Sequence, residues 1–181
     1  MEGNTMHITP VTPVSVGLRY GVLSALTAVI VDFLIRIAGV GFMTFGIVSL
    51  LSGTIITIVW IVIAHKAFKE ANNRLMSFGQ GMVIAVVMML IIGVASSIFN
   101  YIHVHFIDPE FVARLKAGMT EFMERNNVPD DKIAEGTARF DEMSVSLPKD
   151  LLHGITRGLG VGLILGAIVT AFTKRSAPEF E

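Results

Sequence analysis

Four apolar runs, each of about 20 residues or more, constrain the fold of this chain more than any other feature of its sequence. An α-helix of about 20 residues crosses a hydrocarbon core of roughly 30 Å, so each run is long enough to span a membrane. The composition agrees, because 52% of the residues are hydrophobic and only 16% are charged, against about a quarter charged in soluble domains. The sequence therefore predicts an all-α, polytopic membrane protein whose spans are residues 16–38, 42–64, 78–104 and 151–172.

The segments outside the spans are two tails and one longer connection. Residues 1–15 are polar, contain Pro10 and Pro13, and are expected to form a disordered tail ahead of a single membrane domain, residues 16–175. They lack the basic stretch that precedes the apolar segment of a cleavable signal, so the first span is expected to serve as an uncleaved anchor. Residues 176–181 are the second tail.

The long connection, residues 105–150, is too polar to span and is predicted to form a helical extramembrane cap of two amphipathic helices that meet at 126–129. The first is expected to start at 108–110, where Asp108 would cap the helix and Pro109 would occupy its first turn. The second is expected to end before Pro148, because the residue before a proline disfavours helical backbone. Their apolar faces comprise Phe111, Leu115, Met119, Phe122 and Met123 in the first helix, and Ile133, Thr137, Phe140 and Met143 in the second.

Basic residues next to the spans predict the orientation, because short flanks rich in lysine and arginine stay in the cytoplasm. The flanking residues on one predicted side are Arg19, Lys66, Lys69, Arg74, Lys174 and Arg175. The cap also contains basic residues, but they alternate with more acidic ones and are mostly distant from the spans. We therefore expect both termini in the cytoplasm and the cap on the opposite side.

The fourth span carries a glycine zipper, in which small residues recur every four positions along one helix face. Its members are Gly154, Gly158, Gly162 and Gly166. Such a stripe lets another helix backbone approach closely, and Gly17, Gly21 and Ala25 of the first span offer a matching face. Close packing within one bundle and a dimer interface or sliding gate both fit this pattern.

One pair of opposite charges lies within the spans. Asp32 and Arg36 are four residues apart in the first span, so they share a helix face and are expected to pair. They lie toward the end away from Arg19, where a long side chain can reach water. A structural pair and an ion or proton site both remain open.

Polar residues gather where the third span leaves the membrane and the fourth enters it. Histidine and carboxylate together suit a transition metal, and the candidates for such a site are His103, His105, Asp108 and His153. No spacing typical of a zinc enzyme fixes three ligands among them. Interfacial polar residues beside a capped helix start explain the same pattern.

Several classes of site have no support in the sequence. There is no cysteine, which excludes disulfides and thiolate ligands, and the net charge of −1 does not indicate a nucleic-acid partner. No phosphate-binding loop, dinucleotide fingerprint or serine nucleophile motif is present. The sequence therefore nominates no catalytic residue and no cofactor.

Three short stretches, taken with their order and spacing, resemble one known family. They are Ala-His-Lys-Ala-Phe-Lys at 64–69, Ser-Phe-Gly-Gln-Gly at 77–81 and Ile-Asp-Pro-Glu-Phe at 107–111. With the four-span layout they are similar to an uncharacterised bacterial membrane protein family, a domain of unknown function common in Bacteroidetes, over about residues 19–175. The resemblance implies this fold and a bacterial inner membrane, but no activity and no site residue. It also implies a structural role for Phe-Gly-Gln-Gly, which we expect to let the third span pack closely beside the second.

The function expected from these observations is non-enzymatic. The chain would act through helix packing in the lipid bilayer, against a second copy or another membrane protein, with the cap supplying recognition. Two alternatives stay open. One is a small transporter or channel subunit in which Asp32, Arg36 and residues 100–105 line a polar route between helices. The other is a metal-dependent membrane enzyme that uses the four metal candidates named above, three histidines and Asp108.

Overall fold

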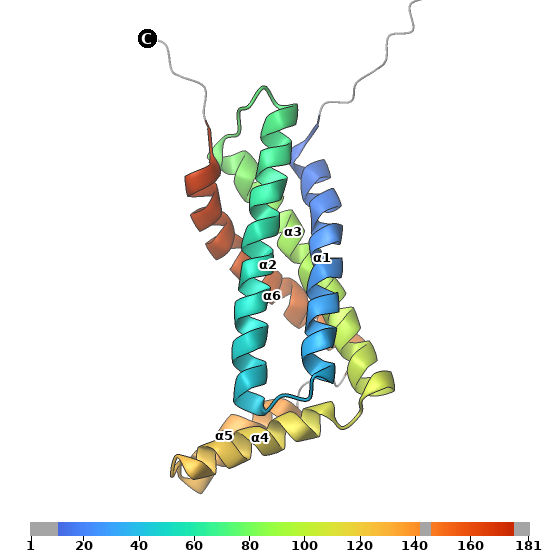
Figure 1. Cartoon of the computed structure of the whole chain (residues 1–181), viewed down its shortest axis with the longest axis vertical. Coiled ribbons are helices and arrows are strands. Elements are labelled where there is room, and N and C mark those ends of the chain that lie inside the picture. The colour runs from blue at the N-terminus through green and yellow to red at the C-terminus, as the bar shows by residue number, and fades with distance from the viewer. Residues whose placement is uncertain (1–10, 142–145, 176–181) are drawn as a thin grey trace, which may run out of the picture.

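The computed structural model describes residues 11–141 and 146–175, and these residues form helices (Figure 1). The elements are α1 (Pro13–Ile37), α2 (Phe42–Ala71), α3 (Phe78–Ile102), a π-helical turn η1 (His103–Ile107), α4 (Phe111–Arg125), α5 (Asp130–Asp141) and α6 (Leu147–Thr173). Four helices are long and apolar enough to cross a membrane: α1, α2, α3 extended by η1, and α6. The predicted all-α, four-span architecture is therefore confirmed.

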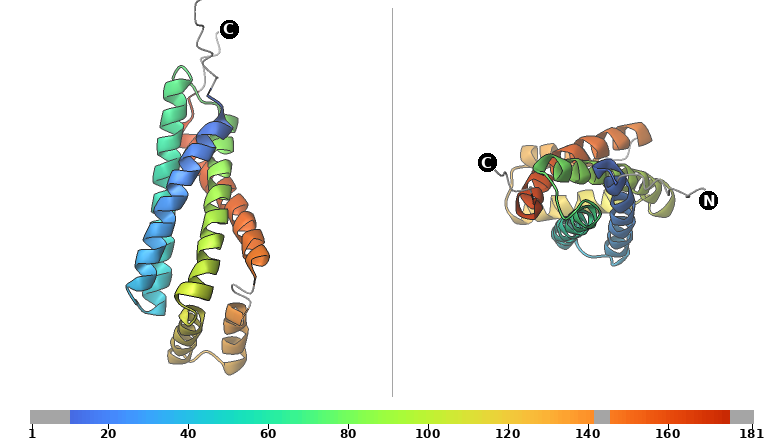
Figure 2. Two further views of the ribbon diagram at one scale, coloured as in Figure 1. Left: turned by 90° about the vertical axis from the view of Figure 1, so that its right-hand side faces the viewer. Right: turned by 90° about the horizontal axis from the view of Figure 1, so that it is seen from above.

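The four spanning helices run along the long axis of the molecule, and the cap helices α4 and α5 cross one end of it (Figure 1). Both ends of the described chain lie at the other end. Helix α3 packs against α1 and α6, and α6 crosses α3 obliquely (Figure 2). Helix α2 packs mainly against α1 and makes smaller contacts with α3, α4 and α6. The cap therefore closes the end of the bundle that is opposite the termini.

The buried core is small and lies toward the end with the termini. Its largest apolar side chains are those of Phe68, Ile61, Met76, Ile84 and Met88. Most other apolar side chains of the spans face outward, including Leu50 at 70% and Ile164 at 65% exposure. This outward apolar surface suits contact with a lipid bilayer, where exposed hydrocarbon carries no cost.

Helix α2 continues beyond its apolar run. The sequence placed the end of the second span at residue 64, but the helix extends to Ala71. His65 and Phe68 are buried, whereas Lys66 and Glu70 point outward and form a loose ion pair. The last two turns are thus amphipathic, and hydropathy marks the end of the apolar segment instead of the end of the helix.

The start of the first cap helix needs correction, whereas the second cap helix ends before Pro148, as predicted. Helix α4 begins at Phe111, after Pro109, and Glu110 is its N-cap residue. The Asp108 carboxylate pairs with Arg114 and also accepts a hydrogen bond from the backbone of Glu110, just ahead of the helix. Pro148 itself lies in the first turn of α6, where a missing N–H and a fixed φ are tolerated. Helix α5 ends at Asp141, and Met143 lies outside the described residues.

The predicted tails are only partly described. Residues 1–10 and 176–181 lie outside the described parts of the chain. Pro13 and its neighbours, assigned to the tail by the sequence, already belong to α1, because Thr12 and Ser15 form a reciprocal capping box.

Candidate functional site

The most concentrated polar constellation joins the spanning bundle to the cap, and we call it the Arg36 junction. The Arg36 Nε donates to Asp32 Oδ2 at 2.9 Å, and Arg36 Nη2 donates to Asn100 Oδ1 of α3 at 3.1 Å. The guanidinium also lies 5.3 Å from the ring of Phe99 and 4.5 Å from the ring of Phe111, the first residue of α4. One charged side chain of α1 therefore contacts both the third span and the cap.

Burial makes these contacts stronger than they would be in water. The Arg36 side chain is only 9% exposed and that of Asp32 is 32% exposed. A cation over an aromatic face contributes up to about 2 kcal/mol when it is desolvated. A buried charge that lost its partner would be destabilising. The pair predicted from the sequence is thus positioned where it can hold the cap in place.

His103 completes the junction. Its ring is 1% exposed and packs edge-on against Phe111 at 5.2 Å and Phe33 at 6.4 Å. Within residues 11–141 and 146–175, neither ring nitrogen has a hydrogen-bond partner, and neither has Arg36 Nη1. Buried polar atoms of this kind are uncommon and favour a site with a role beyond packing.

The turn between η1 and α4 is closed by a second ion pair. The Arg114 guanidinium donates two hydrogen bonds to Asp108, one of them at 3.0 Å. These bonds hold the pKa of Asp108 below its ordinary value, and the same contact raises the pKa of Arg114. Both groups are therefore ionised at neutral pH, and the pair fixes the direction in which α4 leaves the bundle.

Aromatic and glycine contacts dock the rest of the cap on α2. Phe45 meets Phe111 at 5.4 Å, and Phe42 meets Phe140 of α5 at 6.4 Å. Gly118 of α4 lies against Phe42, and a Cβ at Gly118 would come within 2.7 Å of the Phe42 Cβ. The cap thus rests directly on the ends of the spans.

The four metal candidates do not converge. His103 is buried in the junction, whereas His105 stacks on Tyr101 and hydrogen-bonds to its carbonyl. Asp108 is engaged by Arg114, and His153 is exposed on α6. Among the described residues, no three histidine, aspartate or glutamate side chains come together as a metal site would require.

The glycine zipper faces α3. A Cβ at Gly158 would lie 2.6 Å from the Met89 carbonyl oxygen, and one at Gly166 would lie 2.8 Å from the Ala85 Cβ. Gly162 also meets Met89, and Gly154 meets Gly93 and Ser97. The expectation that Gly17, Gly21 and Ala25 form the partner face is wrong: Gly17 and Gly21 approach Val87 and Ile91, which also belong to α3.

A buried histidine that the sequence analysis did not single out ties three spans together. His65 of α2 is fully buried, with Nδ1 2.7 Å from Thr173 Oγ1 of α6 and Nε2 3.0 Å from the Gly81 carbonyl of α3. A carbonyl can only accept, so Nε2 carries a proton. A Cβ at Gly81 would lie 2.5 Å from the Thr170 side chain. Gly81 therefore packs against α6 and hydrogen-bonds to α2, instead of packing closely beside α2 as expected.

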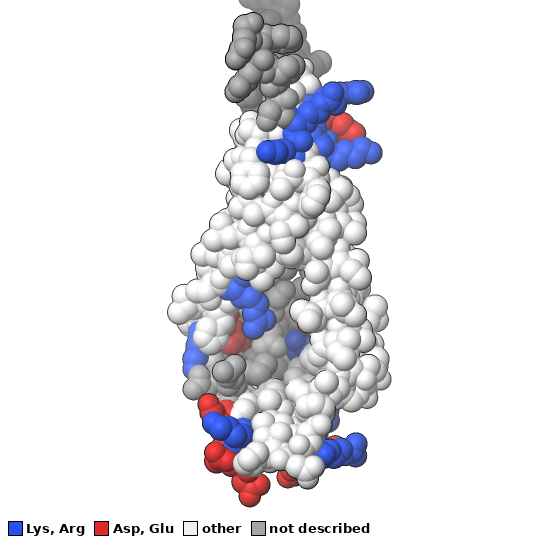
Figure 3. All heavy atoms as spheres, turned by 90° about the vertical axis from the view of Figure 1, so that its left-hand side faces the viewer, with Lys and Arg blue, Asp and Glu red and all other residues white. Residues whose placement is uncertain are grey.

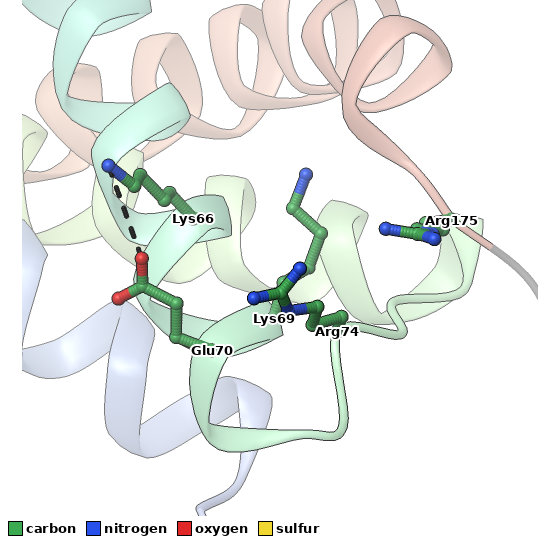
Figure 4. Close-up of a pocket in the computed structure, with 5 residues that line it drawn as sticks. All are labelled: Lys66, Lys69, Glu70, Arg74 and Arg175. Carbon is green, nitrogen blue, oxygen red and sulfur yellow. Dashed lines mark ion pairs between the residues drawn. The ribbon is translucent and has the colours of Figure 1, made fainter.

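Four of the six basic residues that predict one side of the membrane also converge. Lys66, Lys69, Arg74 and Arg175 line one pocket with Glu70 (Figure 4). In the sequence these cations indicate only topology, because the return of the chain after α6 to the α2–α3 turn leaves no local sequence signal.

The comparison with protein families agrees with the resemblance drawn from the sequence. The family described as "Protein of unknown function (DUF4199)" matches residues 19–175. The chain belongs to this family. No curated protein and no solved structure matches it.

The matched region contains all three stretches on which the resemblance rests, and the structure gives each a place. The first supplies His65 and the second supplies Gly81, which are joined by the hydrogen bond described above. The third supplies Asp108 and Phe111 of the cap start. The three stretches thus lie at the two ends of the bundle, where helices contact one another.

Proposed function

We propose that this protein acts without catalysis, as a multi-pass protein of the bacterial inner membrane whose cap recognises a protein partner or a second copy of the chain. The Arg36 junction carries the proposal. The Arg36 side chain pairs with Asp32, hydrogen-bonds to α3 and covers the first residue of α4, so it holds α4 against the ends of α1 and α3. A cap held in this way presents a preformed surface, which lowers the ordering cost of binding.

The proposed orientation has both termini in the cytoplasm and the cap in the periplasm. Basic side chains gather at the end of the molecule that bears the termini, and mixed charges occupy the cap (Figure 3). Positive flanks favour the cytoplasmic side, whereas acidic residues contribute little to orientation.

Photo-crosslinking from the cap in native membranes tests the recognition. A benzoylphenyl group is placed at Phe122, which is 40% exposed on α4, or at Phe172, which is 88% exposed near the end of α6. We expect position 122 to give a discrete, reproducible adduct and position 172 to give none. In Arg36→Gln that adduct should weaken about tenfold, as loss of the cation–π and ionic contacts releases α4. Arg125→Gln, on the exposed end of α4, is the control and should keep it.

Two results would contradict the proposal. Only monomers from both positions would show that the cap has no partner. Equal adducts from positions 122 and 172 would show that association involves the lipid-facing helices instead of the cap.

A second candidate function, transport of an ion or proton, is favoured by one observation. His103 and Arg36 Nη1 are buried polar groups without hydrogen-bond partners in the described chain, and they lie beside Asp32 within the spans. Ionisable and polar groups within membrane spans often mark transport routes.

A further inference from the structure

A basic pocket lies at the end of the bundle opposite the cap (Figure 4). Lys66, Lys69 and Glu70 come from α2, Arg74 from the turn after it, and Arg175 from the segment after α6. Four cations and one carboxylate give the lining a formal charge of +3. The pocket is partly open to solvent and has a volume of about 200 Å³, less than the roughly 300 Å³ at which sites for drug-sized ligands begin, so it suits a small anionic group.

The backbone builds this pocket. Met76 and Arg175 exchange two hydrogen bonds of 2.9 Å, which hold the segment after α6 against the α2–α3 turn. Lys69 Nζ donates to the Thr173 carbonyl at 2.9 Å and secures the end of α6 beside α2. Arg74 has a φ of 64°, and Met76, two residues later, is buried. The turn between α2 and α3 therefore has a defined backbone conformation. The cations are therefore brought together by the fold and are not merely scattered around the ends of the spans.

Little within the described chain compensates these charges. Among the described residues, Glu70 is the only carboxylate in the lining, and its oxygen lies 4.0 Å from Lys66 Nζ. Across residues 11–141 and 146–175, the guanidinium groups of Arg74 and Arg175 form no ion pair, and Arg175 extends toward Lys69 (Figure 4). Like charges brought together repel one another unless an anion lies between them. The positive-inside bias explains basic residues on this side, but it does not require them to converge from three segments.

We propose that this pocket binds a phosphate group, presented by an anionic lipid headgroup. It lies at the ends of the spans α2 and α6, which is the level of the headgroups in a bilayer. Basic pockets between spanning helices on the cytoplasmic side suit lipid phosphates. The arginine fork binds two phosphate oxygens at once, while lysine contributes a compact charge. This site is independent of the cap and of the partner proposed for it.

Thermal unfolding of the full-length protein in detergent micelles tests the proposal. The midpoint is followed while dioleoyl phosphatidylglycerol, dioleoyl phosphatidylcholine or inorganic phosphate is added at constant ionic strength. We expect phosphatidylglycerol to raise the midpoint and phosphatidylcholine with the same acyl chains to leave it nearly unchanged. The variant Arg74→Gln/Arg175→Gln should need about 10- to 30-fold more phosphatidylglycerol for the same shift, given two lost cations.

Arg125→Gln on the cap is the matched control, because Arg125 is exposed and lies at the other end of the molecule; it should respond as the unmodified protein does. If the double variant does not fold, the single variants Arg74→Gln and Arg175→Gln take its place, since both side chains are exposed. Stabilisation by phosphatidylglycerol alone assigns the phosphate to a lipid, and equal stabilisation by inorganic phosphate assigns it to a soluble anion. Equal responses to both lipids, or the same phosphatidylglycerol response in the pocket and control variants, would overturn the proposal.

Discussion

At the scale of single residues, Arg36 shows how a span can carry a charge near its end. Asp32 compensates the charge, Asn100 accepts a hydrogen bond, and Phe99 and Phe111 cover the guanidinium. These groups come from α1, α3 and α4, so the hydrogen bond and the cation–π contacts of one guanidinium join elements that are distant in sequence. The arginine of a charge pair within α1 thereby also connects the bundle to the cap.

Replacing Asp32 by Asn separates a structural pair from a transport site. If the pair is structural, Asp32→Asn leaves a buried guanidinium without its counter-charge and should lower the free energy of unfolding by about 1–3 kcal/mol. Adding Arg36→Met to that variant should recover part of the loss, because the unpaired charge is then removed. Glu121→Gln, which removes an exposed and distant pair with the same four-residue spacing, should change stability by less than about 0.5 kcal/mol.

The measurement is reversible unfolding in mixed detergent micelles, accompanied by proton and cation flux in proteoliposomes. A change in flux from Asp32→Asn with stability and abundance intact would contradict the structural assignment and favour transport.

At the scale of elements, α3 is the helix on which α1 and α6 assemble. Gly17 and Gly21 bring α1 close to one part of its surface, and the glycine zipper brings α6 close to another. Between helices in lipid there is no hydrophobic driving force, so close backbone approach and dispersion are the main source of attraction. The zipper therefore serves packing within the bundle, and its close contacts leave no room for larger side chains.

Two glycines of α6 provide a matched pair of substitutions. Gly158→Ala should destabilise the protein by about 1–3 kcal/mol, because its Cβ would lie 2.6 Å from the Met89 carbonyl oxygen and the helices would have to move apart. Gly160→Ala should be neutral or stabilising by up to about 1 kcal/mol, since nothing lies within 4 Å of its Cβ and alanine favours the helix. Unfolding in mixed micelles measures both. Equal effects of the two substitutions would contradict the assignment of this face to α3.

At the scale of the whole molecule, local sequence patterns predicted the helices but not how their ends meet. The length of the apolar runs predicted the four spans, and apolar residues recurring with a period of 3.6 predicted both cap helices. The junction depends on Arg36 meeting Phe111, and the basic pocket depends on Arg175 meeting Met76. Each joins residues far apart in the chain, so no spacing rule could have revealed it. His65 was overlooked because a histidine at the end of an apolar run looks interfacial unless its burial is known.

The most direct test of the whole account is the accessibility of single cysteines in intact cells, for which the cysteine-free sequence is a clean background. Glu70→Cys reports the end with the termini, and Asn126→Cys reports the tip of the cap; both positions are exposed. We predict that a membrane-impermeant maleimide labels position 126 only, and that position 70 is labelled after the membrane is permeabilised. Labelling of position 70 alone would invert the proposed orientation, and labelling of both positions in intact cells would contradict a four-span bundle with its cap and termini on opposite sides.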